Sequence, residues 1–243
     1  ISKNINDLKE IQPYIDQNDV IFFYGAGCSS KELKNIVSRG LSSIFKRSNL
    51  YINHDIVAAA FATYDGTPSI TGLIGTGANS CSFDGDIVRQ EITGIDYILG
   101  DEGSGAYLGK QLLRDYLYVK LPEDLNVLFE STYDLNRDSI LDKVYKQPYA
   151  NVFLASFVPF IDEHRKHEYL KELLYNSISL YLDMYICSFR NYSNRTTHFV
   201  GSIPHIFSEI FIELAQKKNI LMGNIIKEPI DHLVKYHINK YYK

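Results

Sequence analysis

Apolar runs and helical apolar stripes follow one another through the first 68 residues of the chain. Short unbroken apolar runs are typical of buried strands, and apolar positions three and four apart are typical of helices. On this basis we expect strands at 20–24 and 50–52 and helices over 4–17, 29–41 and 55–62. Ser29 and Glu32 form a capping-box pattern at the start of the second helix. The β-α-β-α order predicts a partly parallel sheet with helices on its faces, and therefore an α/β fold.

A different rhythm begins at residue 69, where short strands follow one another closely. We predict strands at 70–74, 80–83 and 87–92, with a hairpin turn at Asp84-Gly85. Beyond them we expect helices over 103–117, 169–189 and 206–214, shorter helical pieces within 120–165, and a strand at 197–200. A last helix follows Pro229, which suits a first helical turn. Its predicted inward positions are Ile230, Leu233, Val234 and Ile238.

The composition narrows the class of protein. The 243 residues are 45% hydrophobic and 22% charged, which allows one large domain or two smaller lobes with a sizeable core. A net charge of -4 without a basic stripe argues against a nucleic-acid partner. No apolar run reaches the about 18–20 residues of a membrane span, which argues against a membrane partner. Three widely spaced cysteines favour a reducing compartment, so we expect a cytoplasmic protein.

One glycine-rich turn stands between two turns that contain carboxylates. The predicted strand 70–74 ends in Gly75-Thr76-Gly77, and glycines at a strand end let backbone N–H groups approach an anion closely. Asn53-His54-Asp55 precedes this turn, and Gly100-Asp101-Glu102-Gly103 follows it. A phosphate-binding turn flanked by carboxylates suggests an enzyme that positions a phosphoryl donor against a hydroxyl group.

Five segments follow one another along the chain at 24–28, His54-Asp55, 75–80, 100–105 and 199–203. In this order they resemble motifs of the N-acetylglucosamine kinase family in the actin-like ATPase and sugar kinase superfamily. The segment 228–237 also resembles the C-terminal helix of the bacterial members related to the BadF/BadG-type ATPases. The resemblance spans essentially the whole chain and implies a two-lobed actin-like, ribonuclease H-like α/β fold. The lobes would be 1–67 together with the returning helix 224–243, and 68–223, with the first lobe incomplete at its N-terminus.

The resemblance implies catalytic and phosphate-binding roles for two of these turns. Asp55 would accept the proton of a sugar hydroxyl during phosphoryl transfer and would contact the sugar. From the pattern alone, Asp55 could equally be the N-cap of a small-residue helix. Gly75, Thr76 and Gly77 would bind the donor phosphates, and the alternative there is a tight turn after a buried strand.

The resemblance also implies sugar contacts and a nucleotide contact. A carboxamide offers hydroxyl groups both donors and an acceptor, which suits Asn79, and the carboxylate of Asp101 accepts hydrogen bonds from hydroxyls. The alternatives are a turn residue for Asn79 and an N-cap of the helix 103–117 for Asp101. Gly201-Ser202 resembles the adenosine motif, and the alternative is a plain strand–helix turn.

One motif of the family is not found in the chain. The family begins with a strand–turn–strand that contains an Asp-Gly-Gly-Ser/Thr phosphate motif, and we expect this motif to precede Ile1. Asp65-Gly66-Thr67 is superficially similar to it. Its place between the predicted lobes favours an ordinary turn instead.

The resemblance therefore implies a kinase that uses ATP and Mg²⁺ and converts N-acetylglucosamine, a small-molecule sugar, to its 6-phosphate. We predict no metal site made by the protein alone, because His164 and His167 lack a third ligand. The family often forms dimers, which makes the helix 168–190 a candidate interface of a homodimer. Two other functions stay open: a BadF-like ATPase coupled to a partner protein, and a non-catalytic sugar-binding regulatory protein.

Overall fold

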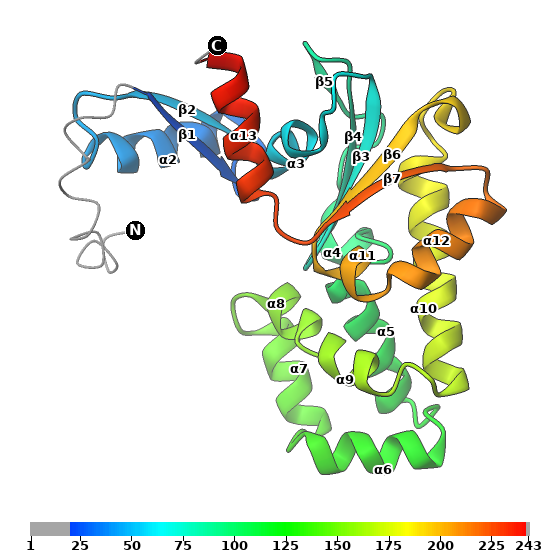
Figure 1. Cartoon of the computed structure of the whole chain (residues 1–243). Helices are drawn as coiled ribbons and strands as arrows, with labels where there is room; N and C mark the ends of the chain where they lie inside the picture. The colour runs from blue at the N-terminus through cyan, green and yellow to red at the C-terminus, as the bar shows by residue number, and fades with distance from the viewer. Residues whose placement is uncertain (1–19, 242–243) are drawn as a thin grey trace.

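The computed structural model describes residues 20–241, so the helix predicted over 4–17 lies outside the described residues. Two sheets are present in this part of the chain (Figure 1). The first has two parallel strands, β1 (Val20–Gly25) and β2 (Asn49–His54), joined by helix α2 (Lys31–Ser42). The second has five strands in the order β5-β4-β3-β6-β7. Its strands are β3 (Ser69–Ile74), β4 (Ala78–Phe83), β5 (Val88–Arg89), β6 (Thr196–Val200) and β7 (Leu221–Ile226).

Strand direction in the five-stranded sheet decides which turns share an edge. β3, β6 and β7 are parallel, with Leu73 of β3 opposite Val200 of β6. β4 pairs antiparallel with both β3 and β5. Parallel strands end at the same edge of a sheet, where ligands commonly bind in α/β folds. The turns that follow Ile74 and Val200 therefore lie side by side.

Helices cover both faces of the five-stranded sheet (Figure 1). α3 (Asp55–Thr63) packs on one face, where Ile56 contacts a cluster that includes Val200. Ile74 and Phe199 belong to the larger core on the other face. Neighbouring residues of β6 thus point to opposite layers, as the two-residue period of a strand requires. The predicted α/β fold, a partly parallel sheet between helices, is confirmed.

The remaining helices lie beside the other face of the sheet and beyond its edge (Figure 1), and the two longest have 13 and 14 residues. They are α5 (Gly105–Leu117), α6 (Glu123–Thr132), α7 (Arg137–Tyr145), α8 (Ala150–Ala155), α9 (Val158–Glu163), α10 (Glu168–Tyr181), α11 (Ser202–Ile206) and α12 (Ser208–Lys217). This part of the chain also has the short helix α4 (Asp96–Leu99), a π-helical turn at Leu182–Ile186 and a 3₁₀ turn at Tyr192–Asn194. No helix within residues 20–241 is both long and apolar enough to span a lipid bilayer.

The last helix, α13 (Ile230–Tyr241), returns to the first part of the chain (Figure 1). His237 stacks on Phe22 of β1 with ring centroids 3.9 Å apart, and its Nε2 lies 2.9 Å from the Tyr24 hydroxyl. Tyr236 stacks on Phe61 of α3 with ring centroids 4.5 Å apart. Aromatic rings, which bury large areas in few side chains, therefore attach α13 to β1 and α3.

The face that α13 buries differs from the predicted one. Leu233 is buried, but Ile230, Val234 and Ile238 are 59%, 47% and 52% exposed, so three of the four inward positions are wrong. Apolar periodicity finds a helical stripe but does not say which neighbour covers it. Here the rings of Tyr236 and His237 pack against α3 and β1 instead.

Three other local features differ from the predicted ones. The N-cap of α2 is Ser30, whose Oγ accepts from the Leu33 N–H, and not Ser29. The helix predicted over 206–214 is divided at Phe207 into α11 and α12. β7 was not predicted, because Gly223 interrupts its apolar pattern and glycine is uncommon in strands.

The predicted turns at Asp84-Gly85 and Asp65-Gly66-Thr67 are confirmed, and in both the Asp side chain binds nearby main-chain amides. Between β4 and β5, the Oδ1 atom of Asp84 accepts hydrogen bonds from the amides of Asp86 (3.0 Å) and Ile87 (2.8 Å). In the segment between α3 and β3, the Oδ1 atom of Asp65 accepts from the amide of Thr67 (3.0 Å). A carboxylate that binds its own backbone two residues on stabilises a turn, so Asp65-Gly66-Thr67 is an ordinary turn.

A buried histidine lies on β6. His198 is 2% exposed, and its Nδ1 accepts a hydrogen bond from the Asn224 amide of β7 (3.0 Å). Among the described residues, its Nε2 has no partner. Burial lowers the pKa of His198, and the carboxylate of Asp65 opposes this effect only in part. The folded protein therefore keeps this imidazole neutral at pH values where the unfolded chain binds a proton.

We expect this histidine to make stability depend on pH. The free energy of unfolding should fall as the pH drops below about 6.5, the ordinary pKa of histidine, and should level off below the depressed pKa of the folded state. The slope from one such group is at most about 1.4 kcal/mol per pH unit. His198→Asn keeps an acceptor for the Asn224 amide but does not titrate. The stability advantage of the wild type over His198→Asn should therefore shrink as the pH falls.

Urea denaturation between about pH 5 and pH 8 measures this difference. The exposed residue His205 gives the matched control, because His205→Asn also removes a histidine but leaves the buried imidazole of His198 in place. A constant difference between the wild type and His198→Asn would contradict the prediction.

Candidate active site

Two glycine turns meet at the carboxyl edge of the five-stranded sheet. The turn 75–77 joins β3 to β4, and Gly201 follows β6, the strand beside β3. Gly201 has a φ of 122°, and a Cβ built on it would lie 2.1 Å from the carbonyl oxygen of Ile74. A side chain here would collide with backbone and would disfavour this φ, so only glycine fits. The exposed residue Ser202 begins α11 directly after it.

Hydrogen bonds from α5 hold the carbonyl groups of the 75–77 turn. The amides of Gly105 and Ala106 donate to the carbonyl oxygens of Gly75 (2.8 Å) and Thr76 (3.0 Å). The Gly75 amide donates to the carbonyl of Gly77 (2.9 Å). Within residues 20–241, the amides of Thr76 and Gly77 and the exposed Thr76 hydroxyl have no hydrogen-bond partner. Adjacent free N–H groups beside the N-terminus of a 13-residue helix suit an anion.

The carboxylate of Asp101 lies against the same turn. Its Oδ1 accepts from the Ala78 amide (3.1 Å), and a Cβ built on Gly77 would lie 2.8 Å from its Oδ2. Asp101 is 8% exposed, and burial raises the pKa of its carboxyl, while the bond from Ala78 lowers it in part. The N-cap of α5 is Ser104, which accepts from the Tyr107 amide. The alternative that Asp101 caps this helix is therefore wrong.

Asn79 lies on β4, just beyond the turn. Its Oδ1 accepts hydrogen bonds from the Ser80 amide (2.9 Å) and from Gln90 Nε2 (2.7 Å). Among the described residues, its Nδ2 has no partner. Asn79 is thus a strand residue, not a turn residue. The protein uses the acceptor half of the carboxamide, so only its donors are available to a ligand, and not both halves as the sequence suggested.

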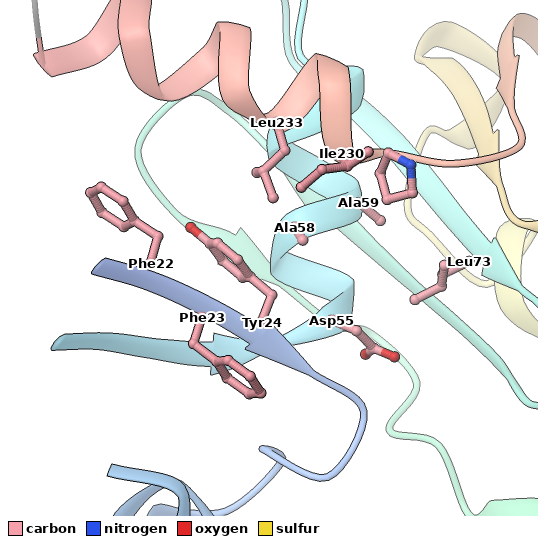
Figure 2. A pocket seen from close by; sticks show the side chains of 10 residues that line it. Phe22, Phe23, Tyr24, Asp55, Ala58, Ala59, Leu73, Ile230 and Leu233 are labelled. Atoms are coloured by element: carbon pink, nitrogen blue, oxygen red, sulfur yellow. The ribbon is translucent and has the colours of Figure 1, made fainter. Parts of the chain in front are cut away.

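Asp55 begins α3 and lines a hollow of about 390 Å³, in which Leu73 of β3 also lies. The N-cap of α3 is His54, so the alternative that Asp55 is the cap is wrong. The buried Oδ1 of Asp55 lies 3.0 Å from His54 Nδ1, and neither atom has a well-formed hydrogen bond with any described residue. Figure 2 shows the carboxylate pointing out from the start of α3, away from the ring of Tyr24. This carboxylate is available to a ligand in the hollow.

The structure brings most of the predicted site residues together but leaves Asp55 at some distance. α3 lies on the sheet so that Cys81 Sγ of β4 is 3.7 Å from the carbonyl oxygen of Ile56. Leu73, which pairs with Asn79, borders the same hollow as Asp55. Within residues 20–241, Asp55 makes no hydrogen bond with 75–79, Asp101 or 201–202. Asp55 therefore lies on the wall of a hollow beside β3, and the other residues lie where β3 ends.

The donor groups at this edge suit phosphate better than a metal held by the protein alone. In the described part of the chain, no group of three or more His, Cys, Asp or Glu side chains could hold a metal ion. Mg²⁺ commonly keeps several waters and binds one or two carboxylates together with substrate phosphates. Free amides and a free hydroxyl, as in the 75–77 turn, are donors that phosphate oxygens accept from.

Three side chains that lie at this edge could not be identified from the sequence pattern. Gln90 follows β5, and the β4–β5 register, with Ser82 opposite Arg89, puts it opposite Cys81, two residues from Asn79 on the same face of β4. Lys110 of α5 donates to the carbonyl of Tyr97 at 2.7 Å, and burial lowers the pKa of its ammonium. Tyr181 of α10 read as one more apolar position of a helical stripe. Nothing in the helical period distinguishes a hydroxyl that reaches the site from a ring that only packs.

Comparison with known proteins identifies the family. No protein-family model matches the chain, and no curated protein matches it significantly. The structure matches that of a candidate N-acetylglucosamine kinase from Porphyromonas gingivalis with a TM-score of 0.90 and 31% identity, over 97% of this chain and 83% of that one. A candidate N-acetylglucosamine kinase from Chromobacterium violaceum shares the fold, with a TM-score of 0.54 and 14% identity over 82% of this chain and 71% of that one. The chain therefore belongs to the N-acetylglucosamine kinase-like family and has the actin-like sugar kinase fold.

Proposed function

We propose that the protein is an ATP-dependent sugar kinase that converts N-acetylglucosamine to its 6-phosphate. The observation that supports this most is the 75–77 turn, where two free amides and a free hydroxyl lie next to the buried carboxylate of Asp101. Groups of this kind suit a phosphoryl donor beside a hydroxyl acceptor. The name of the related Porphyromonas gingivalis protein supports an amino sugar as that acceptor.

On the donor side, the amides of Thr76 and Gly77 and the Thr76 hydroxyl would bind the terminal phosphates of ATP, which supplies the phosphoryl group. The N-terminus of α5, which donates to this turn, would favour their negative charge. Gly201-Ser202 would lie next to the nucleoside. The Gly201 backbone lies directly against the end of β3, which leads into the phosphate-binding turn 75–77. Mg²⁺ would be held by the phosphates and by water, and we assign it no side chain.

On the acceptor side, Asp55 would accept the proton of the sugar 6-hydroxyl. The hydroxyl oxygen forms a bond to the γ-phosphorus while the bond from that phosphorus to the bridging oxygen breaks, and ADP leaves. Asn79 Nδ2 would donate to one of the other sugar hydroxyls. The lone pairs of Asp101 that Ala78 does not use would accept from another.

We propose that two lobes, 1–67 with 224–243 and 68–223, close over the sugar. Asp55 belongs to the first lobe, and Asn79, Asp101 and the turn 75–77 belong to the second. Closure would bring the base to the hydroxyl and would exclude water, because hydrolysis of ATP is the competing reaction. This division accounts for the distance between Asp55 and the sheet edge.

A substrate panel tests the proposed function. Purified protein is given ATP, Mg²⁺ and one of several hexoses or N-acetylhexosamines, and the release of ADP is followed in a coupled assay. We expect release that depends on the sugar and is fastest with N-acetylglucosamine, with phosphorus found on O6 of the product by NMR. ATP turnover that is the same with and without every sugar would contradict a sugar kinase. Turnover with hexoses but not with N-acetylglucosamine would contradict only the assigned acceptor.

Replacing Asn79 with alanine separates the two sides of the site. Loss of the Nδ2 donor should raise the KM of the sugar about 3–10-fold, the effect of one hydrogen bond, with a smaller effect on the KM of ATP. Steady-state kinetics with each substrate varied in turn measure both values. Asn126→Ala on α6, far from the edge, should change neither. A larger effect on the KM of ATP would place Asn79 on the nucleotide side.

A further inference from the structure

The helix α10 does not end in a normal α-helical turn. It continues into a π-helical turn, Leu182–Ile186, in which the Cys187 amide donates to the carbonyl of Leu182 (2.8 Å). Such turns are rare and often occur at functional sites. The turn exposes Asp183 and Met184 to solvent and leaves two tyrosines, one before it and one inside it, buried.

Tyr181, the tyrosine before the turn, reaches the sheet. Its side chain is fully buried, and its hydroxyl donates to the main-chain carbonyl of Asn79 (3.1 Å). A Cβ built on Gly72 of β3 would lie 2.4 Å from this hydroxyl, and one built on Gly103 would lie 2.7 Å from the Tyr181 Cβ. Tyr181 therefore occupies space that two glycines, one on β3 and one before α5, leave open for it.

Tyr185, inside the turn, reaches the loop that contains Asp101. Its ring stacks on Tyr181 with centroids 5.1 Å apart, and it is 2% exposed. Its hydroxyl lies against the loop that leads into Asp101, since a Cβ built on Gly100 would lie 3.5 Å from it. Burial raises the pKa of this hydroxyl to about 12. Its own carbonyl accepts from the Ser80 hydroxyl (2.8 Å). The two tyrosines thus contact the β4 strand and the loop that leads into Asp101 together.

We propose that Tyr181 and Tyr185 are positioning residues for the sugar. They fix the distance between Asn79 and Asp101, and this distance sets the position of the bound sugar. This inference rests on the proposed function, because Asn79 and Asp101 are the residues assigned to the sugar. A stacked pair of rings is stiff. The Tyr181 hydroxyl binds the main chain of Asn79, and the Tyr185 hydroxyl lies against the loop that leads into Asp101. The aromatic rings alone would fill the same space. The hydroxyls are therefore the groups through which these residues act.

The proposal is tested with tyrosine-to-phenylalanine variants, which keep the rings. We expect Tyr181→Phe and Tyr185→Phe each to raise the KM of the sugar about tenfold or more, and to change the KM of ATP less than about twofold, because positioning errors act on one substrate only. Tyr175→Phe is the matched control. It lies on the same helix, and its hydroxyl binds Lys217 (2.7 Å) away from the edge. It should leave both values unchanged.

Amide hydrogen exchange of the free protein gives a second readout. Tyr185→Phe should speed exchange in the segment 100–104, and Tyr175→Phe should not. An unchanged sugar KM in both edge variants, or equal loss of affinity for the two substrates, would overturn the inference while the wild type still phosphorylates sugar. If the wild type shows no sugar-dependent turnover, the proposed function fails. In that case unchanged exchange in 100–104 would overturn the positioning role separately.

Discussion

Replacing Asp55 with asparagine is expected to lower kcat about 10²–10⁴-fold while the sugar still binds. Asparagine has nearly the same shape but cannot accept the proton of the attacking hydroxyl. The loss should appear equally in kcat and in kcat/KM, as for an interaction made mainly in the transition state. Steady-state kinetics and calorimetric titration with sugar measure the two effects separately.

The structure indicates that this variant folds. The buried Oδ1 of Asp55 has only a 3.0 Å contact with His54 Nδ1, and no described residue makes a well-formed hydrogen bond to it. The expected cost is the loss of a favourable charge in the first turn of α3, about 0.3–1 kcal/mol, which is too small to unfold the protein. Asp86→Asn on the exposed β4–β5 turn is the control, and its kcat should stay at the wild-type value. A kcat for Asp55→Asn within twofold of the wild type would remove Asp55 from the mechanism.

Replacing Gly201 with alanine is expected to lower the free energy of unfolding by about 2–4 kcal/mol. The new Cβ would lie 2.1 Å from the carbonyl oxygen of Ile74, a backbone atom that cannot move away without disturbing β3. The φ of 122° adds strain, because L-residues rarely adopt it. For a chain of this size the melting temperature should fall by roughly 5–15 °C.

The same substitution should also weaken nucleotide binding, because β3 leads directly into the phosphate turn. Thermal denaturation with and without ATP measures both effects in one experiment, since a ligand that binds only the folded state raises the melting temperature. Gly27→Ala is the control. A Cβ on Gly27 would have no atom within 4 Å. The free energy of unfolding of Gly27→Ala should therefore stay within about 0.5 kcal/mol of the wild-type value. Wild-type stability and ATP affinity in Gly201→Ala would show that the close approach of β6 and β3 is unimportant.

Some features of the site could be predicted from the sequence because they are local. The strand 70–74 and the glycine turn after it follow from an apolar run that stops at Gly75, and both are present. The hairpin at Asp84-Gly85 follows from side chains that bind their own backbone. Such features depend on neighbours within a few residues, and the sequence itself gives these neighbours.

Other features could not be predicted because they depend on distant partners. The sequence left Asp101 open between a helix cap and a ligand residue. The choice against the cap depends on Ser104, which caps α5, and on the Ala78 amide, which binds the Asp101 carboxylate. β7 was missed for a related reason, because its segment becomes a strand only by pairing with β6.

The sequence by itself determined the α/β class, most strands of the sheet, and the residue types of the turns, because periodicity and glycine act over short stretches of backbone. Only the tertiary structure decided which turns share an edge. Leu73 pairs with Val200, and this parallel pairing puts the 75–77 turn beside Gly201. It also decided that Tyr181 of α10 and Tyr185 of the π-helical turn after it reach this edge. Contacts between residues far apart in the chain are set by how whole layers pack, and no local pattern records them.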